Sequence, residues 1–241
     1  MLRQARARNP LVPLRIFRSR TVTGANLIQV LMVAGLFGMF FLGALFMQRV
    51  LGYDALEVGL AFLPVALAIG VLSVGVSARL ITRFGGVQTL LPGLVLIAAG
   101  LALFARAPVD ATYAADILPS MLLLGVGAGL GFPALMTLAM SGATPSDSGL
   151  ASGLVNTTQQ VGGALGLAVL ATLSTTRSDG LLADGESTAT ALTDGYHLAF
   201  TIGVGLVLGA IVLSVGLLRS QQAPALAEAE PDAEVLLEEA A

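Results

Sequence analysis

Residues 149–170 read GLASGLVNTTQQVGGALGLAVL, and this segment is apolar and long enough to cross a membrane, which takes about 20 residues. It nevertheless contains five consecutive polar residues, Asn156 to Gln160, and five glycines. Small residues let membrane helices approach closely, and polar side chains in the apolar zone need partners or a wet cavity. The segment therefore predicts a membrane helix around which other helices pack.

The composition of the whole chain is that of a membrane protein with several spans. Of its 241 residues, 56% are hydrophobic and 11% are charged, and the mean hydropathy is +0.88. A soluble domain has about 25% charged residues. Cys is absent, which excludes disulfides and thiolate metal sites. The apolar run after the Arg-rich start exceeds the roughly 7–15 residues of a signal peptide core, so it is interpreted as a first span.

Six apolar runs, each near the length needed to cross a lipid bilayer, follow one another along the chain. Because they are continuously apolar rather than alternating, they predict helices and not a barrel. The expected fold is an all-α, six-helix transmembrane bundle over residues 21–219. The expected spans are approximately 22–47, 56–78, 87–106, 114–140, 149–173 and 196–218.

Three segments outside these runs have distinct compositions. Residues 1–20 are basic, and they are expected either to lie on the cytoplasmic membrane surface or to be a solvated lead-in. Residues 220–241 are acidic and are expected to form a disordered cytoplasmic tail. The segment 174–195 is rich in Ser, Thr, Asp and Gly, and is predicted to be an irregular, mobile outer loop.

The arginines predict the orientation of the bundle. With the N-terminus inside, nine arginines fall on the inner side, among them Arg79 and Arg83, and three fall outside: Arg49, Arg106 and Arg177. This agrees with the excess of positive charge in cytoplasmic segments. Both termini are therefore predicted to be cytoplasmic, in a plasma membrane protein.

One face of the first run combines amides with phenyl rings. Helical spacing places seven side chains there: Asn26, Gln29, Val33, Phe37, Phe40, Ala44 and Gln48. A largely apolar surface with a few polar anchors is typical of a small-molecule cavity. The alternative is a helix–helix seam in which the amides hydrogen-bond across to a neighbour.

The fifth run has a comparable face. The residues that share it are Gly149, Ser152, Asn156, Gln160, Gly163 and Leu167. The pairs Gly149/Gly153 and Gly162/Gly166 each form a GxxxG motif, which favours close helix packing. The polar residues are interpreted as part of a transport path, and the alternative is a structural polar network.

Two other features concern packing and turns. The fourth run holds Gly125, Gly129 and Pro133, which predict close packing, with or without a hinge, and a kink at the proline. Arg79 and Arg83 flank a short inner turn in which Gly85 permits a tight bend. These arginines are expected either to cap neighbouring helices or to signal topology only.

No pattern typical of an enzyme is present. The chain lacks a nucleophile elbow, a P-loop, an HExxH motif and a metal-ligand cluster, so no catalytic residue, metal, cofactor or nucleic-acid partner is predicted. His197 is the only histidine and is expected at the membrane interface. No ionisable residue lies in the middle of a predicted span, whereas proton-coupled carriers usually keep one there.

Three segments carry a resemblance to a known family: Phe46–Pro64, the glycine-rich Gly125–Pro133, and Ser152–Gly166. Over about residues 9–218 the chain resembles the C-terminal half of a major facilitator superfamily transporter. Within that superfamily it is most similar to the fourteen-span drug:proton antiporters of the EmrB/QacA type. Thr82 stands where the family's inner-loop motif has Asp, and Gln159 stands where many relatives have Arg.

The resemblance implies efflux of amphipathic organic compounds against proton influx, by alternating access between two six-helix halves. It implies that the first, second, fourth and fifth runs surround the cavity. The chain by itself is expected not to be a competent antiporter, and to need a missing N-terminal half or a second copy of itself. The rival interpretations are a non-transporting membrane subunit or assembly partner and, less in accord with the residues, a membrane-embedded enzyme.

Overall fold

The computed structural model describes residues 19–143 and 147–218, and every regular element in these ranges is a helix. The predicted all-α class is confirmed. The acidic tail and all but the last two residues of the basic lead-in lie outside the described residues.

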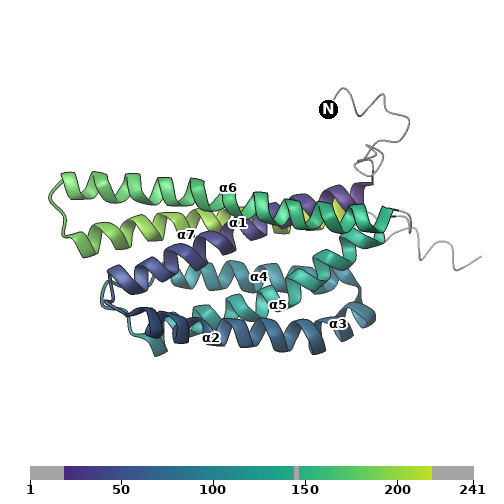
Figure 1. Cartoon of the computed structure of the whole chain (residues 1–241), viewed down its shortest axis with the longest axis horizontal. Coiled ribbons are helices and arrows are strands. Elements are labelled where there is room, and N and C mark those ends of the chain that lie inside the picture. Colours follow the sequence, from purple (N-terminus) through teal and green to yellow (C-terminus); the bar gives the residue numbers. More distant parts are fainter. Residues whose placement is uncertain (1–18, 144–146, 219–241) are drawn as a thin grey trace, which may run out of the picture.

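The described helices follow the order of the six predicted spans (Figure 1). In chain order they are α1 (Arg20–Arg49); α2 (Ala55–Val71), continued by the π-helix η2 (Leu72–Val76) and by α3 (Ser77–Phe84); α4 (Gly86–Phe104); the π-helix η3 (Tyr113–Ile117), continued by α5 (Leu118–Ser141); α6 (Ser148–Ala183); and α7 (Thr188–Leu213), continued by the π-helix η5 (Ser214–Leu218). Among the described residues, five of these six helical stretches are long and apolar enough to cross a membrane, and α6 is not one of them. The amides of α6 lower its mean hydropathy, so its membership of the bundle is inferred from its contacts with neighbouring helices.

Local sequence explains where several helices begin. Asp54 and Glu57 form a capping box at the start of α2, in which each side chain accepts a hydrogen bond from the other residue's backbone N–H. Ser187 caps α7 by accepting from the backbone N–H of Thr190 at 3.2 Å. Gly85 has φ of 90° between α3 and α4, a conformation that favours glycine and allows the sharp turn.

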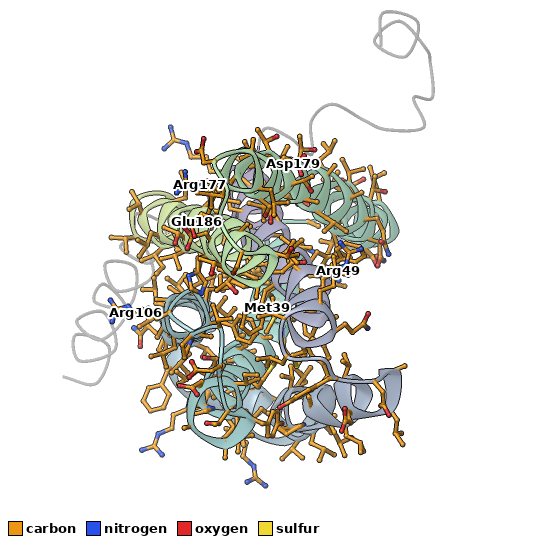
Figure 2. All side chains as sticks on the ribbon, turned by 90° about the vertical axis from the view of Figure 1, so that its left-hand side faces the viewer. Met39, Arg49, Arg106, Arg177, Asp179 and Glu186 are labelled. Atoms are coloured by element: carbon orange, nitrogen blue, oxygen red, sulfur yellow. The ribbon has the colours of Figure 1, made fainter. Side chains whose placement is uncertain are left out.

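The helices form two groups that share one core. Helices α1, α6 and α7 pack together on one side, and α2, α3, α4 and α5 on the other (Figure 1). Helix α4 contacts α7 as well as α5, and α1 contacts α5, so the two groups are joined. Seen end-on, the fully buried Met39 lies near the middle of the bundle (Figure 2).

An aromatic cluster closes the core at the end where α1 finishes and α7 begins. The rings of Phe104 and Phe200 meet edge to face at 4.9 Å between centroids, and Phe46 packs edge-on against Phe104 at 5.9 Å. Tyr196 meets Phe46 at 6.3 Å. These residues come from α1, α4 and α7, so edge-to-face contacts join the two helix groups at this end.

The glycines of α5 serve two different neighbours. Gly125 and Gly129 face α2, whereas Gly127 and Gly131 lie on the side towards α4 and α1. Two residues that are two positions apart on a helix point in nearly opposite directions, about 200° apart. Glycines at every second position therefore place one pair of glycines on each of two opposite faces of α5. Helix α5 remains helical through Pro133, which is half-buried.

The prediction of an irregular loop over 174–195 is wrong. Helix α6 continues through this segment to Ala183, and α7 begins at Thr188. An ion pair between Arg177 and Asp194, 3.6 Å from nitrogen to oxygen, joins the two helices. The composition of this segment is typical of a loop, but serine and glycine also let two helices pack closely. Here the contact between α6 and α7 outweighs the local preference for a loop.

Candidate functional site

The second half of α6 is closed against α1. A Cβ atom added at Gly162 would lie 3.0 Å from the α1 backbone, and one at Gly163 would lie 2.8 Å from the ring of Phe37. A Cβ at Gly166 would collide with Ala34. These three glycines therefore let α6 lie directly on α1, and Phe37 is half-buried in that contact.

The first half of α6 presents an open face. A Cβ at Gly149 or Gly153 would meet no atom within 4 Å. Asn156 and Gln160 are both exposed, and the side-chain amide of Asn156 donates to the carbonyl of Ser152, one turn earlier, at 3.2 Å. We call the surface of α6 formed by Gly149, Gly153, Asn156 and Gln160 the open polar face.

A buried polar contact lies between α1 and this half of α6. Nε2 of Gln29 donates to the carbonyl of Val155 at 3.4 Å and to Oε1 of Gln159 at 3.5 Å. Nδ2 of Asn26 donates to the carbonyl of Val22 at 2.8 Å, within its own helix. Oδ1 of Asn26 is buried and has no hydrogen-bond partner among the described residues.

An unpaired buried oxygen is uncommon, because leaving such a group unsatisfied costs about 1–3 kcal/mol. Asn26 precedes Gln29 by about one turn of α1, so its oxygen belongs to the same end of the α1–α6 contact. A donor supplied from outside the described residues would remove this cost.

The residue that meets Gln29 is Gln159, which the predicted face of α6 does not include. Helical spacing assigned Asn156 and Gln160 to one face, whereas Gln159 points about 100° away from Gln160. The two adjacent glutamines could have indicated this contact, because neighbouring side chains on a helix point towards two different surfaces.

The predicted face of α1 divides along its length. Asn26 and Gln29 are buried against α6, which is the geometry of a helix–helix seam. Phe40 is half-buried, and its ring packs on that of Phe62 in α2 at 5.5 Å between centroids. Gln48 is exposed at the far end.

The inner-turn residues make few contacts. Arg79 and Arg83 are both exposed, and the guanidinium of Arg83 lies 5.3 Å from the ring centre of the adjacent Phe84. Within the described ranges neither arginine side chain caps another helix by a hydrogen bond. Gly85, between α3 and α4, supplies the turn.

A pocket of about 720 Å³ lies at the other end of the bundle, between α1, α6 and α7. None of the residues predicted for a cavity lines it. Its polar side chains are Arg49, Ser174, Thr175, Ser178, Asp179, Thr188 and Tyr196. We call it the α1–α6–α7 pocket.

Several acidic side chains of the described residues sit at helix ends and serve local roles. Glu57 belongs to the cap of α2, and Asp116 accepts from the backbone N–H of Thr112 at 2.7 Å. His197 shares a hydrogen bond of 2.8 Å with the carbonyl of Ala107. No group of three metal-ligating side chains occurs in the part of the chain that the structure describes.

Comparison with known proteins places this geometry in a family. A family model of the Major Facilitator Superfamily matches residues 2–167. The puromycin resistance protein pur8 of Streptomyces alboniger is 34% identical, over 88% of this chain and 42% of its own length. The cephamycin export protein CmcT of Amycolatopsis lactamdurans is 36% identical, over 93% of this chain and 44% of its own length.

A third relative, the lincomycin resistance protein of Streptomyces lincolnensis, is 34% identical over 88% of this chain and 41% of its own length. The chain therefore spans less than half the length of these curated relatives.

Proposed function

This chain belongs to the major facilitator superfamily, and from that premise we propose that its bundle is one of two that together export amphipathic organic compounds. Three of its relatives are named for resistance to, or export of, puromycin, cephamycin and lincomycin. Proton influx is the proposed driving force, and alternating access between two bundles is the proposed mechanism.

The observation that carries this proposal is the open polar face of α6. Asn156 and Gln160 are accessible in a helix whose other side is closed against α1. Uncovered amides are unfavourable in lipid, so they need either a water-filled cavity or a partner. The buried, unpaired oxygen of Asn26 lies at the same end of the α1–α6 contact. The proposal assigns this surface to one wall of the substrate path.

A second bundle supplies the opposite wall in this proposal. It belongs either to the same longer polypeptide or to a separate chain, and a second copy of this bundle is the homo-oligomeric form. Beyond the open polar face, α6 also exposes three apolar side chains, which turn progressively away from that face: Val161, Leu165 and Val169.

The proposed location is the plasma membrane, with both ends of the chain in the cytoplasm. In this orientation Arg79 and Arg83 face the cytoplasm, and Arg49, Arg106 and Arg177 face outward. The support is the excess of arginine on the inner side. We propose a transport role without enzymatic chemistry, supported by the family and by the absence of catalytic motifs in the sequence.

The test substitutes Asn156→Leu and Gln160→Leu in the polypeptide expressed with its own neighbouring coding sequence, in a host that lacks efflux pumps. Puromycin accumulation is measured together with assembly in native gels. Loss of most puromycin export with unchanged assembly is expected. Thr172→Leu is the matched control, because Thr172 is exposed on α6 beyond the amides and bonds only to the Ala168 carbonyl at 2.8 Å.

Unchanged export with weakened assembly would overturn the proposal and favour a non-transporting subunit. A purified chain that by itself exchanges protons for puromycin in vesicles would instead remove the need for a second bundle.

A further inference from the structure

We propose that the α1–α6–α7 pocket binds an amphipathic organic acid, a molecule with an apolar ring or chain and a carboxylate. This binding requires neither a second bundle nor transport, so it goes beyond the proposed function.

The pocket has the size and walls of a small-molecule site. Its volume of about 720 Å³ lies within the roughly 300–1,000 Å³ typical of such sites. Apolar side chains from all three helices form much of its lining: Phe41, Leu42, Leu45, Ala171, Leu182 and Leu192. Such walls accommodate an apolar body and leave recognition to a few polar groups.

Two serines with little exposed surface line the pocket and direct attention to its polar wall. Ser174 and Ser178 are only 2% and 3% exposed, and within residues 19–143 and 147–218 neither hydroxyl makes a hydrogen bond. By contrast, Thr172 on the same helix bonds to the carbonyl of Ala168. Both serines line the pocket, where their hydroxyls can donate to a ligand with acceptor atoms.

A cation lies near these hydroxyls. Arg49 and Tyr196 line the same pocket as Ser174 and Ser178. Tyr196 follows Gly195, where an added Cβ would collide with the Ser178 hydroxyl and lie 3.3 Å from that of Ser174. Arg49, Tyr196 and the two serines therefore offer several hydrogen-bond donors from one region of the pocket.

Arg49 is not neutralised by an acid. Within the described residues it has no carboxylate within 4 Å, whereas Arg177 at the same end pairs with Asp194. A planar guanidinium binds a carboxylate through two parallel hydrogen bonds. Asp179 also lines the pocket but is exposed and forms no ion pair with Arg49. The donors around Arg49 outnumber this one acid, so they select an organic anion.

The absence of cysteine from the sequence permits a direct binding assay. Thr175→Cys places a single thiol in the pocket, because Thr175 is exposed and lines it. The control is Thr176→Cys, on the next residue, which is exposed but does not line the pocket. The purified chain in detergent is labelled with a maleimide in the presence of 1-naphthaleneacetate, its neutral amide, or 1-naphthylmethylamine.

Naphthaleneacetate is expected to protect the thiol of the Thr175→Cys variant and not that of the Thr176→Cys variant. At about ten times the dissociation constant, about a tenth of the sites stay free, so labelling should slow about tenfold. Adding Arg49→Gln to the Thr175→Cys variant should abolish this protection. Adding Arg106→Gln instead should retain it, since Arg106 lies at the same end of the bundle on the side away from Arg49 (Figure 2).

Three results would overturn the proposal. Equal protection by the neutral amide would show that Arg49 does not select the ligand, and better protection by the amine would assign the site to Asp179. The third result combines two observations: the thiol is protected in phosphatidylglycerol vesicles without added acid, and naphthaleneacetate does not protect it in detergent. This result would assign the pocket to a lipid. None of these results depends on export, so they are distinct from a failure of the proposed transport role.

Discussion

Helices α5 and α6 are both rich in glycine, but they use it differently. A Cβ atom added at any glycine of Gly125–Gly131 in α5 would lie within 4 Å of another helix. In α6, Gly162 and Gly166 meet α1, whereas Gly149 and Gly153 face open space. Two GxxxG motifs in one helix thus have opposite environments. The GxxxG motif permits close helix packing, and whether such packing occurs depends on which helix lies beside it.

The difference also concerns polarity. Helix α5 lies between α2 and α4 and carries no side-chain amide, whereas α6 lies at the edge of the bundle and holds its amides at the open end. An inner helix with unpaired amides would be destabilised, while an edge helix can present them to a cavity. This contrast between a closed α5 and a half-open α6 yields three tests.

The largest effect is expected for Gly127→Ala in α5. The added Cβ would lie 2.6 Å from the carbonyl oxygen of Gly93 and 2.8 Å from the backbone nitrogen of Ile97. Because both are backbone atoms, the helices must separate, and we expect a loss of about 3 kcal/mol in the free energy of unfolding. Thermal unfolding of the chain in detergent, followed by circular dichroism, measures it.

Gly153→Ala is the matched control in α6. Its Cβ would meet nothing within 4 Å, so only the helix preference for alanine remains, which stabilises by about 0.5–1 kcal/mol. Equal destabilisation by the two substitutions would contradict the difference between α5 and α6.

An intermediate effect is expected for Gly166→Ala, at the closed end of α6. The new Cβ collides with Ala34, but α6 lies at the edge and can shift outward, so we expect a loss of about 1–2 kcal/mol. Combining it with Ala34→Gly should recover part of the stability, because the two sites are in direct contact. Strict additivity in this double-mutant cycle would argue against the α1–α6 seam.

The smallest effect is expected for Arg177→Gln, which removes the ion pair with Asp194. The two side chains are 51% and 47% exposed, and an exposed pair contributes less than about 1 kcal/mol. The difference from the unsubstituted chain should vanish at high salt. A larger loss that persists at about 1 M salt, where the Debye length is only about 3 Å, would show that the pair holds α6 and α7 together more strongly than its exposure indicates.

Much of the fold follows from the sequence because the physical constraint is local. An apolar run of about 20 residues must satisfy its own backbone hydrogen bonds in lipid, so the six runs had to be helices. The structure confirms the helices and their order. The segment 174–195 was the exception, because its composition is compatible with a loop and with a pair of closely packed helices.

The candidate site was less accessible to sequence reasoning. Helical spacing shows which residues share a face, but not which neighbour that face meets. Asn26 and Gln29 share the face of Phe40, yet Gln29 bonds to α6 whereas Phe40 packs on α2. The α1–α6–α7 pocket was missed altogether, because Arg49, Ser178 and Tyr196 come from three helices and form no pattern along the chain.

By itself, the segment 149–170 determined that a helix with amides and glycines belongs to a membrane bundle. Only the tertiary structure decided that Gly162 and Gly166 are closed while Gly149 and Gly153 are open, and that Gln159 rather than Gln160 meets Gln29. The physical reason is that hydropathy and hydrogen bonding act within a helix, whereas steric contact and the pairing of polar groups depend on the helix beside it.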